Sequence, residues 1–360
     1  MSELSIIVPT FNEVDNIFPL YEAIEKVLTD VDWEIVYVDD DSTDGTLSIL
    51  NKICTEKPNV RRIHRIARRG LSSAGVEGFL STTSPFLAII DGDLQHDETK
   101  LIEMLSLIRT GDYDLILGSR YADDGGFGDW DETRIAASRF ATKLSRLITR
   151  QPITDPMSGF FMLTRDALNK SVRNLSLRGY KLLLDIVTSF PGEMRIKDVS
   201  FEFRSRIHGN SKLDNIVMME FVFMIIEKFT LGFLPARLVL FSAVGTSGLL
   251  VHFSVLYLLL NIINIDFLYA QAGATLVAMT SNFFINNWLT YFDRRLRGLK
   301  LLKGLFTFYA VCSLGSIANV GAATFVFSQN YTWFVSGFAG ALIGTVWNYA
   351  ATSLITWRNK

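Results

Sequence analysis

The sequence predicts two regions of different fold class, an α/β domain with a mainly parallel sheet and a following bundle of membrane-spanning helices. Of the 360 residues, 49% are hydrophobic and only 20% are charged. Most of the charged residues precede residue 214, and the later residues are mostly apolar. In the first region, short β-branched runs alternate with longer segments of helical period, which is typical of βαβ units. The two regions therefore suit different solvents.

Five strands and four helices are expected in the first region. The predicted strands are residues 5–9, 34–39, 60–66, 86–90 and 115–119. The predicted helices between them are residues 16–28, 46–56, 72–81 and 99–110. This alternation favours parallel strands connected by helical crossovers.

Polar residues follow four of the predicted strands. The first strand ends in PTFNE, the second in VDDDSTDGT, the fourth in DGDLQH and the fifth in GSRY. Ligands bind to such sheets beyond the carboxyl ends of the strands, so we predict a ligand site at this edge. The sequence lacks G-x-G-x-x-G after the first strand, which disfavours a dinucleotide-binding dehydrogenase, and it lacks G-x-x-x-x-G-K-[ST], which excludes a P-loop ATPase.

Charge and cysteine content exclude other classes. The formal net charge of −2 implies no general attraction to nucleic acid. The two cysteines, Cys54 and Cys312, fall in different regions and form no disulfide framework. The four histidines show no zinc-binding spacing.

The stretch IDGDLQH, residues 90–96, raises the question of a bound cation. In an extended chain, residues two apart point to the same side, so Asp91, Asp93 and Gln95 would converge. Carboxylate and amide oxygens suit a hard divalent cation. The alternative is a strand that ends in a purely structural polar turn, because Asp is a common turn residue.

Seven motifs, taken in order, resemble the family 2 glycosyltransferases with the GT-A fold, and more narrowly the dolichyl- or polyprenyl-phosphate mannose synthases. The motifs are SIIVPTFNE, VDDDSTDGT, RGLSSAGVEGF, DGDLQH, GSRY, DPMSGFF and HGNSKL. The resemblance implies a GT-A domain, a nucleotide-diphospho-sugar transferase, over residues 1–212.

This resemblance implies a nucleotide-sugar site at the carboxyl edge of the sheet. Mg²⁺ or Mn²⁺ on Asp91, Asp93 and Gln95 would neutralise the leaving diphosphate. The residues expected to bind the nucleotide sugar are Pro9, Phe11, Glu13, Val38, Asp40, Asp91, Arg206 and Lys212.

Two parts of this assignment have structural alternatives. Ser42 or Asp44 could simply cap the helix that follows the second strand. Arg68 and Arg69, which precede a helix, suit an anion, but they could equally form a solvated basic turn.

The resemblance also implies an acceptor site for a polyprenyl or dolichyl phosphate. Arg120, Arg134 and Ser138 are expected to bind the lipid phosphate, and Asp93, Arg120 and Arg134 are expected to be catalytic. Asp155 and Ser158 are candidate partners of the sugar hydroxyls. A surface ion pair is the alternative for each basic residue of this set.

The predicted reaction is an inverting transfer of a hexose to this lipid phosphate, with mannose from GDP-mannose preferred. A phosphate monoester is already ionised, so we expect no general base and catalysis mainly by positioning and charge neutralisation. UDP-glucose is the alternative donor. The alternative function is that of a lipid-linked sugar flippase subunit, and a polymerising synthase is disfavoured because no Q-x-x-R-W motif is evident.

Four membrane spans are expected in the second region, at residues 238–260, 269–292, 302–327 and 333–355, each long enough to cross a bilayer. Residues 237–360 resemble the GtrA-like membrane domains found with such transferases. Residues 213–236 contain charges within apolar sequence and are expected to form interfacial amphipathic helices. A further span at 213–234 is the alternative.

The charge of the connectors predicts the orientation of an integral membrane protein. The connectors NIINID and SQNYT lack Lys and Arg, whereas DRRLRGLK and the terminal WRNK are basic. By the positive-inside rule, the catalytic domain and both termini face the cytoplasm. The first residues, MSELSIIVPTFNE, do not resemble a secretory signal, which agrees with this orientation.

Polar and small residues in the spans predict how the helices pack. We expect the asparagines to face the bundle interior and to form interhelical hydrogen bonds, and we expect glycines to permit close approach of the helices. A lipid pathway is the alternative role for the asparagines. The residues concerned are Asn282, Asn286, Asn287, Asn319 and Asn348, and Gly245, Gly248, Gly315, Gly340 and Gly344.

Overall fold

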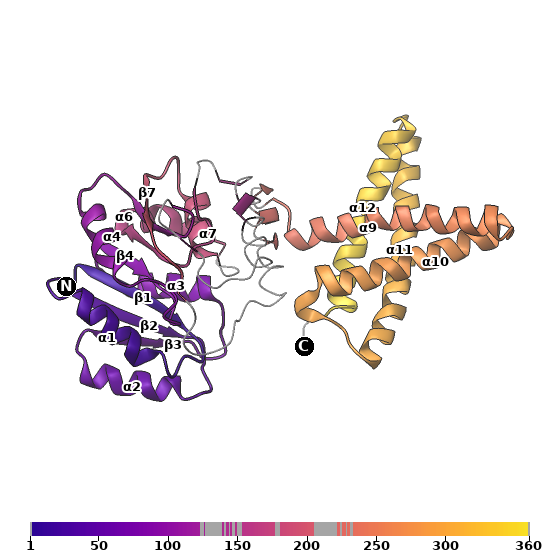
Figure 1. The fold of residues 1–360 in the computed structure, drawn as a ribbon. Coiled ribbons are helices and arrows are strands. Elements are labelled where there is room, and N and C mark those ends of the chain that lie inside the picture. Colours follow the sequence, from indigo (N-terminus) through magenta and orange to yellow (C-terminus); the bar gives the residue numbers. More distant parts are fainter. Residues whose placement is uncertain are drawn as a thin grey trace. The chain divides into compact units, whose positions relative to one another are not determined.

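The computed structural model divides into two compact units, Met1–Phe229 and Thr230–Lys360. The first is an α/β unit and the second is helical (Figure 1), which confirms the predicted division of fold class. The structure describes residues 2–122, 126, 139, 142–143, 145, 148–149, 153–176, 181–204, 222–223, 225–227, 229–230 and 233–358.

The first unit is built on a seven-stranded sheet with the order β3-β2-β1-β4-β6-β5-β7. Only β6 runs against its neighbours, pairing antiparallel with β4 and β5, so the predicted mainly parallel sheet is confirmed. The five predicted strands are present within two residues, whereas β6 and β7 were not predicted. The strands are β1 (Leu4–Thr10), β2 (Trp33–Asp39), β3 (Val60–His64), β4 (Phe86–Ile89), β5 (Leu115–Ser119), β6 (Phe161–Thr164) and β7 (Ile196–Ser200).

Helices cover both faces of this sheet. Alternate residues of β1 point to opposite faces, so Ile6 and Val8 join one hydrophobic core and Ile7 joins the other. Helices α1, α2 and α4 pack on the first face, and α3, α6 and α7 pack on the second. The first four helices agree with the prediction within one residue. The six helices are α1 (Ile17–Val27), α2 (Thr46–Glu56), α3 (Leu71–Leu80), α4 (Lys100–Arg109), α6 (Arg165–Ser171) and α7 (Leu182–Ser189).

Helix α3 approaches the sheet closely because of two glycines. A Cβ atom at Gly78 would lie 2.3 Å from Cγ2 of Ile7, and one at Gly75 would lie 2.5 Å from Cδ2 of Leu182. Overpacking of this kind is destabilising, so the glycines of the RGLSSAGVEGF motif have a packing function. Their close contact brings the start of α3 next to the end of β2.

The second unit contains four long helices, α9 (Ala236–Tyr257), α10 (Phe267–Ile285), α11 (Leu299–Ser328) and α12 (Trp333–Ile355). Each predicted span overlaps one of them. Among the described residues, the stretches Ala236–Ile262 and Leu299–Val326 are long and apolar enough to cross a membrane by length and composition. Crossing by all four helices stays a prediction.

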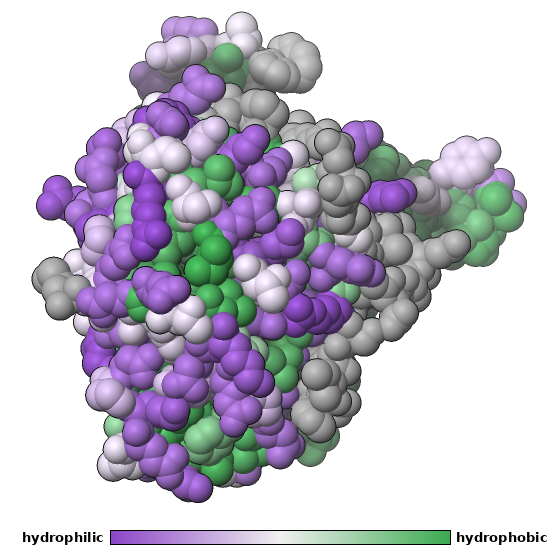
Figure 2. Space-filling model, turned by 60° about the vertical axis from the view of Figure 1, so that its left-hand side comes forward, coloured by the Kyte–Doolittle hydropathy of each residue, from purple (hydrophilic) through white to green (hydrophobic). Residues whose placement is uncertain are grey.

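The surface of the second unit suits lipid. Leu250 is 73% exposed and Ile317 is 71% exposed, and many further large apolar side chains of these helices are also exposed. Among the described residues of the first unit, the exposed large apolar residues are Ile66, Leu80, Ile102 and Phe229, the last residue of the unit. Figure 2 shows this contrast, with mainly hydrophilic residues on the visible face of the first unit and hydrophobic residues on the visible helices. An apolar surface this extensive marks contact with another apolar phase.

The second unit contains two helical hairpins with equivalent polar contacts. The side chain of Asn282 in α10 lies against Gly248 in α9, and the side chain of Asn348 in α12 lies against Gly315 in α11. Both asparagines therefore face a neighbouring helix, as predicted. The predicted interhelical hydrogen bond is not formed by either carbonyl oxygen, since both are buried without a donor among the described residues.

Asn287 anchors the end of α12. Its Oδ1 accepts hydrogen bonds from Trp357 Nε1 at 3.0 Å and from the Leu296 amide at 2.8 Å. The Trp357 ring also stacks on Tyr291, with ring centres 4.2 Å apart and planes inclined by 4°. Buried aromatic stacking and these hydrogen bonds hold the two hairpins together.

We predict that Gly315→Ala destabilises the second unit. The new Cβ atom would lie 1.9 Å from Oδ1 of Asn348 and 3.0 Å from Cδ1 of Trp347. Overpacking costs about 1–3 kcal/mol, more than the roughly 1 kcal/mol that Ala gains over Gly in a helix. The melting temperature of the full chain in detergent should fall. Gly321→Ala is the matched control in α11, because no atom lies within 4 Å of its Cβ position; equal melting temperatures for the two variants would refute the prediction.

Candidate active site

The carboxyl ends of β1, β2, β3 and β4 lie on one edge of the sheet, because these strands are parallel. The loop after each of them contains one non-glycine residue with a left-handed backbone. Such conformations cost about 1–3 kcal/mol and persist only where surrounding contacts impose them, often at functional sites. The four residues are Asn12, Asp41, Ala67 and Leu94, with φ between 52° and 62°.

The loops after β1 and β2 are joined by hydrogen bonds. The Asn12 amide donates to Ser42 Oγ at 2.8 Å, and Ser42 Oγ donates to Asp39 Oδ1 at 2.5 Å. Asp44 accepts from the Thr46 amide at 3.0 Å, at the start of α2, and from the Val14 amide at 3.2 Å. The N-cap of α2 is Gly45, which makes no side-chain cap hydrogen bond, so neither residue occupies the capping position. Asp44 binds the first helical amide from the position before the cap, and Ser42 fixes the loop onto Asp39.

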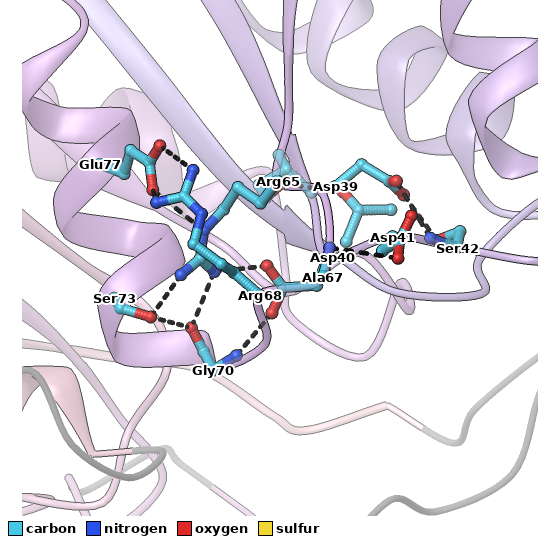
Figure 3. Close-up of polar contacts among 12 residues, drawn as sticks. Asp39, Asp40, Asp41, Ser42, Arg65, Ala67, Arg68, Gly70, Ser73 and Glu77 are labelled. Atoms are coloured by element: carbon cyan, nitrogen blue, oxygen red, sulfur yellow. Dashed lines mark hydrogen bonds and ion pairs between the residues drawn. The ribbon is translucent and has the colours of Figure 1, made fainter.

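Asp40, the predicted nucleoside contact, is held on a buried arginine (Figure 3). Its carboxylate pairs with Nη1 of Arg65 and accepts a 2.7 Å hydrogen bond from the Gly70 amide. Desolvation raises the pKa of the Asp40 carboxyl, and the Gly70 amide and the Arg65 charge oppose this rise. These contacts use two of roughly four acceptor positions of the carboxylate, so Asp40 is a fixed group that can still accept from a ligand.

Arg65 was not predicted as a site residue, although it supports the whole edge. Its side chain is 3% exposed and also binds Glu77 Oε2 at 3.0 Å, Ser73 Oγ at 2.6 Å and the Gly70 carbonyl at 3.2 Å. Arg65 therefore connects the end of β2 to the first turns of α3. Its position directly after β3, the strand beside β2, was the signal that could have identified it.

The neighbouring arginines have other partners. Arg68 pairs with Glu77 at 2.9 Å, and the guanidinium carbon of Arg69 lies 4.1 Å from the ring centre of Phe11. A cation in this position is attracted to the aromatic face. Arg69 thus covers the ring that is predicted to line the base pocket.

Three further residues predicted to bind the nucleotide sugar are Pro9 on β1, Val38 on β2 and Glu13 in the loop after β1. Pro9 pairs with Val38 across β1 and β2. The Val38 side chain is buried beneath α3, with Cγ2 3.0 Å from a Cβ position at Gly78, so only its main chain can face a ligand. Glu13 Oε2 accepts from Asn16 at 2.7 Å.

The DGDLQH stretch forms a turn and is not extended, because Leu94 has φ of 60° and the Asp93 carboxylate accepts from the Gln95 amide at 3.2 Å. The extended geometry assumed from the sequence is therefore wrong. Asp93 and Gln95 are 7% and 6% exposed, whereas the Asp91 side chain is 32% exposed. Any convergence of the three side chains depends on this turn.

Arg204 fixes the turn from beside it. Its amide donates to the Gln95 carbonyl at 2.8 Å, and the Gln95 side-chain nitrogen donates to the Arg204 carbonyl at 3.0 Å. The Arg204 guanidinium pairs with Asp97 and Glu98, each at 2.7 Å. With its nitrogen bound, the Gln95 amide has Oε1 as its possible ligand for a cation.

The donor set fits a hard divalent cation. Among the described residues, no three Asp, Glu, His or Cys side chains are grouped to hold a metal, so a cation here would use Asp91 and Asp93 with the amide of Gln95. A Cβ atom at Gly159 would lie 3.0 Å from Oδ2 of Asp91, so the glycine leaves room for this carboxylate. Oxygen donors of these two kinds suit Mg²⁺ or Mn²⁺.

Arg120, the predicted phosphate ligand, follows β5 and forms a buried bidentate pair with Asp155. Nε lies 2.7 Å from Oδ2 and Nη2 lies 2.8 Å from Oδ1, and the two residues are 6% and 0% exposed. Desolvation acts to lower the pKa of Arg120, but the hydrogen bonds that its guanidinium donates to Asp155, together with the charge of that carboxylate, raise the pKa above its already high usual value. Asp155 therefore orients a permanent positive charge. Its predicted sugar contact is disfavoured because the residue is 0% exposed and its carboxylate accepts three hydrogen bonds from Arg120.

The remaining candidates divide into two groups. Ser158 Oγ donates to the Phe160 carbonyl at 3.2 Å and accepts from the Phe160 amide at 3.1 Å, so its hydroxyl serves a turn. The predicted residues that lie outside the described part of the chain are Arg134, Ser138, Arg206 and Lys212.

We predict that Asp155→Asn destabilises the first unit by about 3–5 kcal/mol, because it removes the bidentate carboxylate partner of a buried arginine. Asp114→Asn is the matched control. Asp114 also forms a bidentate pair, with Arg195, but that arginine side chain is 56% exposed, and an exposed pair contributes about 1 kcal/mol at most. Thermal melting in detergent should show a much larger decrease for Asp155→Asn, and similar decreases for both variants would contradict the assignment.

Known proteins resemble this chain over both units. A family model described as glycosyl transferase family 2 matches residues 5–172, and one for the GtrA/DPMS transmembrane domain matches residues 240–357. The first match agrees with a GT-A-type α/β fold, and the second agrees with the exposed apolar helices of a membrane protein.

Three curated relatives carry one name, dolichol-phosphate mannosyltransferase. The protein from Pyrococcus furiosus is 29% identical over 357 residues, which are 99% of each chain. The protein from Mycosarcoma maydis is 34% identical over 66% of this chain and 83% of its own length. The protein from Saccharomyces cerevisiae is 32% identical over 66% of this chain and 91% of its own length. The chain therefore belongs to the dolichol-phosphate mannosyltransferase family of glycosyltransferases, with a family 2 glycosyltransferase domain and a GtrA/DPMS transmembrane domain.

Proposed function

We propose that this glycosyltransferase transfers mannose from GDP-mannose to a polyprenyl or dolichyl phosphate. The observation that carries the proposal is the likeness to dolichol-phosphate mannosyltransferases, which in one relative extends over 99% of both chains. The edge of the sheet supports it, because a fixed carboxylate follows β2, a set of hard oxygen donors follows β4 and a buried arginine follows β5.

In this proposal, Asp40 binds the nucleoside, with Pro9, Phe11 and Glu13 nearby. Asp91, Asp93 and Gln95 hold Mg²⁺ or Mn²⁺, which when bound supplies positive charge to the leaving diphosphate. Arg65 and Gly70 keep Asp40 in place, so the site is organised before the nucleotide enters, which lowers the entropic cost of binding.

Arg120 is proposed to hold the lipid phosphate with Arg134 and Ser138, and Arg206 and Lys212 to contact the diphosphate. The pairing of Arg120 with Asp155 fixes the guanidinium, and a fixed cation stabilises a phosphate without reorganisation during the reaction. The acceptor oxygen is already ionised, so its attack on the anomeric carbon needs no general base and inverts the configuration there. The nucleoside diphosphate leaves as the glycosidic bond breaks.

We further propose that residues 1–212 form the catalytic domain, that residues 213–236 lie along the membrane surface and that residues 237–360 span the membrane, with the catalytic domain and both termini in the cytoplasm. Phe233 is 83% exposed and Leu234 is 47% exposed directly before α9. Exposed apolar side chains beside a membrane helix suit the interfacial region of a bilayer.

Transfer to lipid can be measured with purified protein, a polyprenyl phosphate, Mn²⁺ and radiolabelled nucleotide sugars. We expect label from GDP-mannose to enter the chloroform-soluble fraction, and label from UDP-glucose to enter it poorly. A reversed preference would replace mannose by glucose, and the absence of a labelled lipid with either donor would overturn the proposed reaction.

Asp93→Ala should reduce this transfer at least 100-fold without changing the melting temperature of the helical unit, because it removes a proposed cation ligand. Asp30→Ala is the control, since Asp30 is an exposed carboxylate before β2, at the opposite edge of the sheet. Chelation by EDTA should abolish the activity of the unmodified protein, and full activity in EDTA would refute the cation.

A further inference from the structure

His96 is enclosed by aromatic rings directly behind the DGDLQ turn. Its side chain is 3% exposed. The ring of Phe160 stacks on it, with ring centres 5.4 Å apart, and Phe201 and Phe203 contact it edge-on at 5.5 Å and 5.3 Å. Phe160 precedes β6, and the other two follow β7, so two separate parts of the fold fix the orientation of this imidazole.

The imidazole bonds back to the start of the turn. Nδ1 of His96 accepts a hydrogen bond from the Asp91 amide at 3.2 Å and lies 3.8 Å from Oδ2 of the Asp91 carboxylate. An accepting Nδ1 requires the neutral tautomer with its proton on Nε2.

Asp91 is therefore confined on two sides. The imidazole fixes its main chain, and Gly159 leaves only enough room for its carboxylate, since a Cβ atom there would lie 3.0 Å from Oδ2. If His96 only filled space beside Asp91, position 96 would need the volume of a ring but no hydrogen-bond acceptor. The hydrogen bond from the Asp91 amide therefore indicates a role for Nδ1 of His96 beyond packing.

We propose that His96 is a positioning residue for the cation site, which sets the direction of the Asp91 carboxylate through the Asp91 main chain. This inference rests on the proposed function, because Asp91 is a proposed cation ligand. Groups that orient metal ligands typically contribute 10-fold to 100-fold to metal affinity. His96 does not touch the cation or either substrate in this role.

Two substitutions separate the acceptor from the ring. His96→Phe keeps an aromatic ring of similar volume but removes the acceptor. His96→Asn places Oδ1 at the same bond separation from Cα as Nδ1 of histidine, but leaves a cavity among the three phenylalanines. We expect His96→Asn to lose more thermal stability, because cavities in a core are costly.

Binding of Mn²⁺ to the full-length protein can be measured by electron paramagnetic resonance with GDP present. It should rank the two variants in the opposite order to their thermal stability, with His96→Phe the weaker binder. We expect the dissociation constant of Mn²⁺ to increase at least 10-fold in His96→Phe and no more than about 3-fold in His96→Asn. If affinity instead follows stability, with His96→Asn the weaker binder, His96 is only a core residue and the inference is wrong.

The same titration distinguishes failure of this inference from failure of the proposed function. If the unmodified protein and Asp93→Ala bind Mn²⁺ equally, the cation site itself is absent. If only Asp93→Ala loses Mn²⁺ binding and His96→Phe binds Mn²⁺ as the unmodified protein does, the cation site is supported and the proposed role of His96 is wrong. Melting temperatures of all variants, measured in parallel, establish that each is folded.

Discussion

The candidate site depends on the burial of the sheet on both faces. Residues of β1, β2 and β4 are almost all buried, because helices cover the sheet on each side, and charged side chains cannot lie within such strands without compensation. Polar groups can be placed only beyond the strand ends. The parallel strands then bring these ends to one edge, where Asp40, Asp91 and Arg120 follow three different strands.

Charges at this edge are held by buried partners. Arg65 binds Asp40, and Asp155 binds Arg120, in both cases with the arginine almost fully buried. Buried ion pairs often contribute little net stability because desolvation offsets their attraction. Their effect here is to fix orientation, since Arg65 and Asp40 have partners on several segments and Arg120 forms a bidentate pair with Asp155. A site organised in this way needs little rearrangement when a charged substrate binds.

The helical unit meets a different constraint. Its outer surface is apolar, so burial of apolar area between helices gains little in lipid, and close packing and polar contacts must hold the helices together. The pairs Gly248 with Asn282 and Gly315 with Asn348 supply the close packing in each hairpin, and the hydrogen bonds of Asn287 supply polar contacts between the hairpins. The stack of Tyr291 on Trp357 then joins the ends of the second and fourth helices.

The sequence by itself determined the elements whose signals are local. The apolar runs of β1, β2, β4 and β5, the periodicity of α1 to α4 and the long apolar helices were predictable because each pattern is complete within one segment. Seven ordered motifs, together with their family resemblance, also indicated the candidate residues on the edge. The antiparallel strand β6 has only four residues, and β7 carries charges, so neither has a strong local signal.

Only the tertiary structure decided which partners fix those residues. Arg65 and Asp40 are 25 residues apart and Arg120 and Asp155 are 35 apart, so no local pattern joins them. The turn at DGDLQH could not be distinguished from an extended strand end, because its left-handed residue is Leu94, a type that rarely adopts that conformation without tertiary contacts. The residue types thus predicted the chemistry of the candidate site at this edge, whereas the geometry of the site comes from contacts between distant segments.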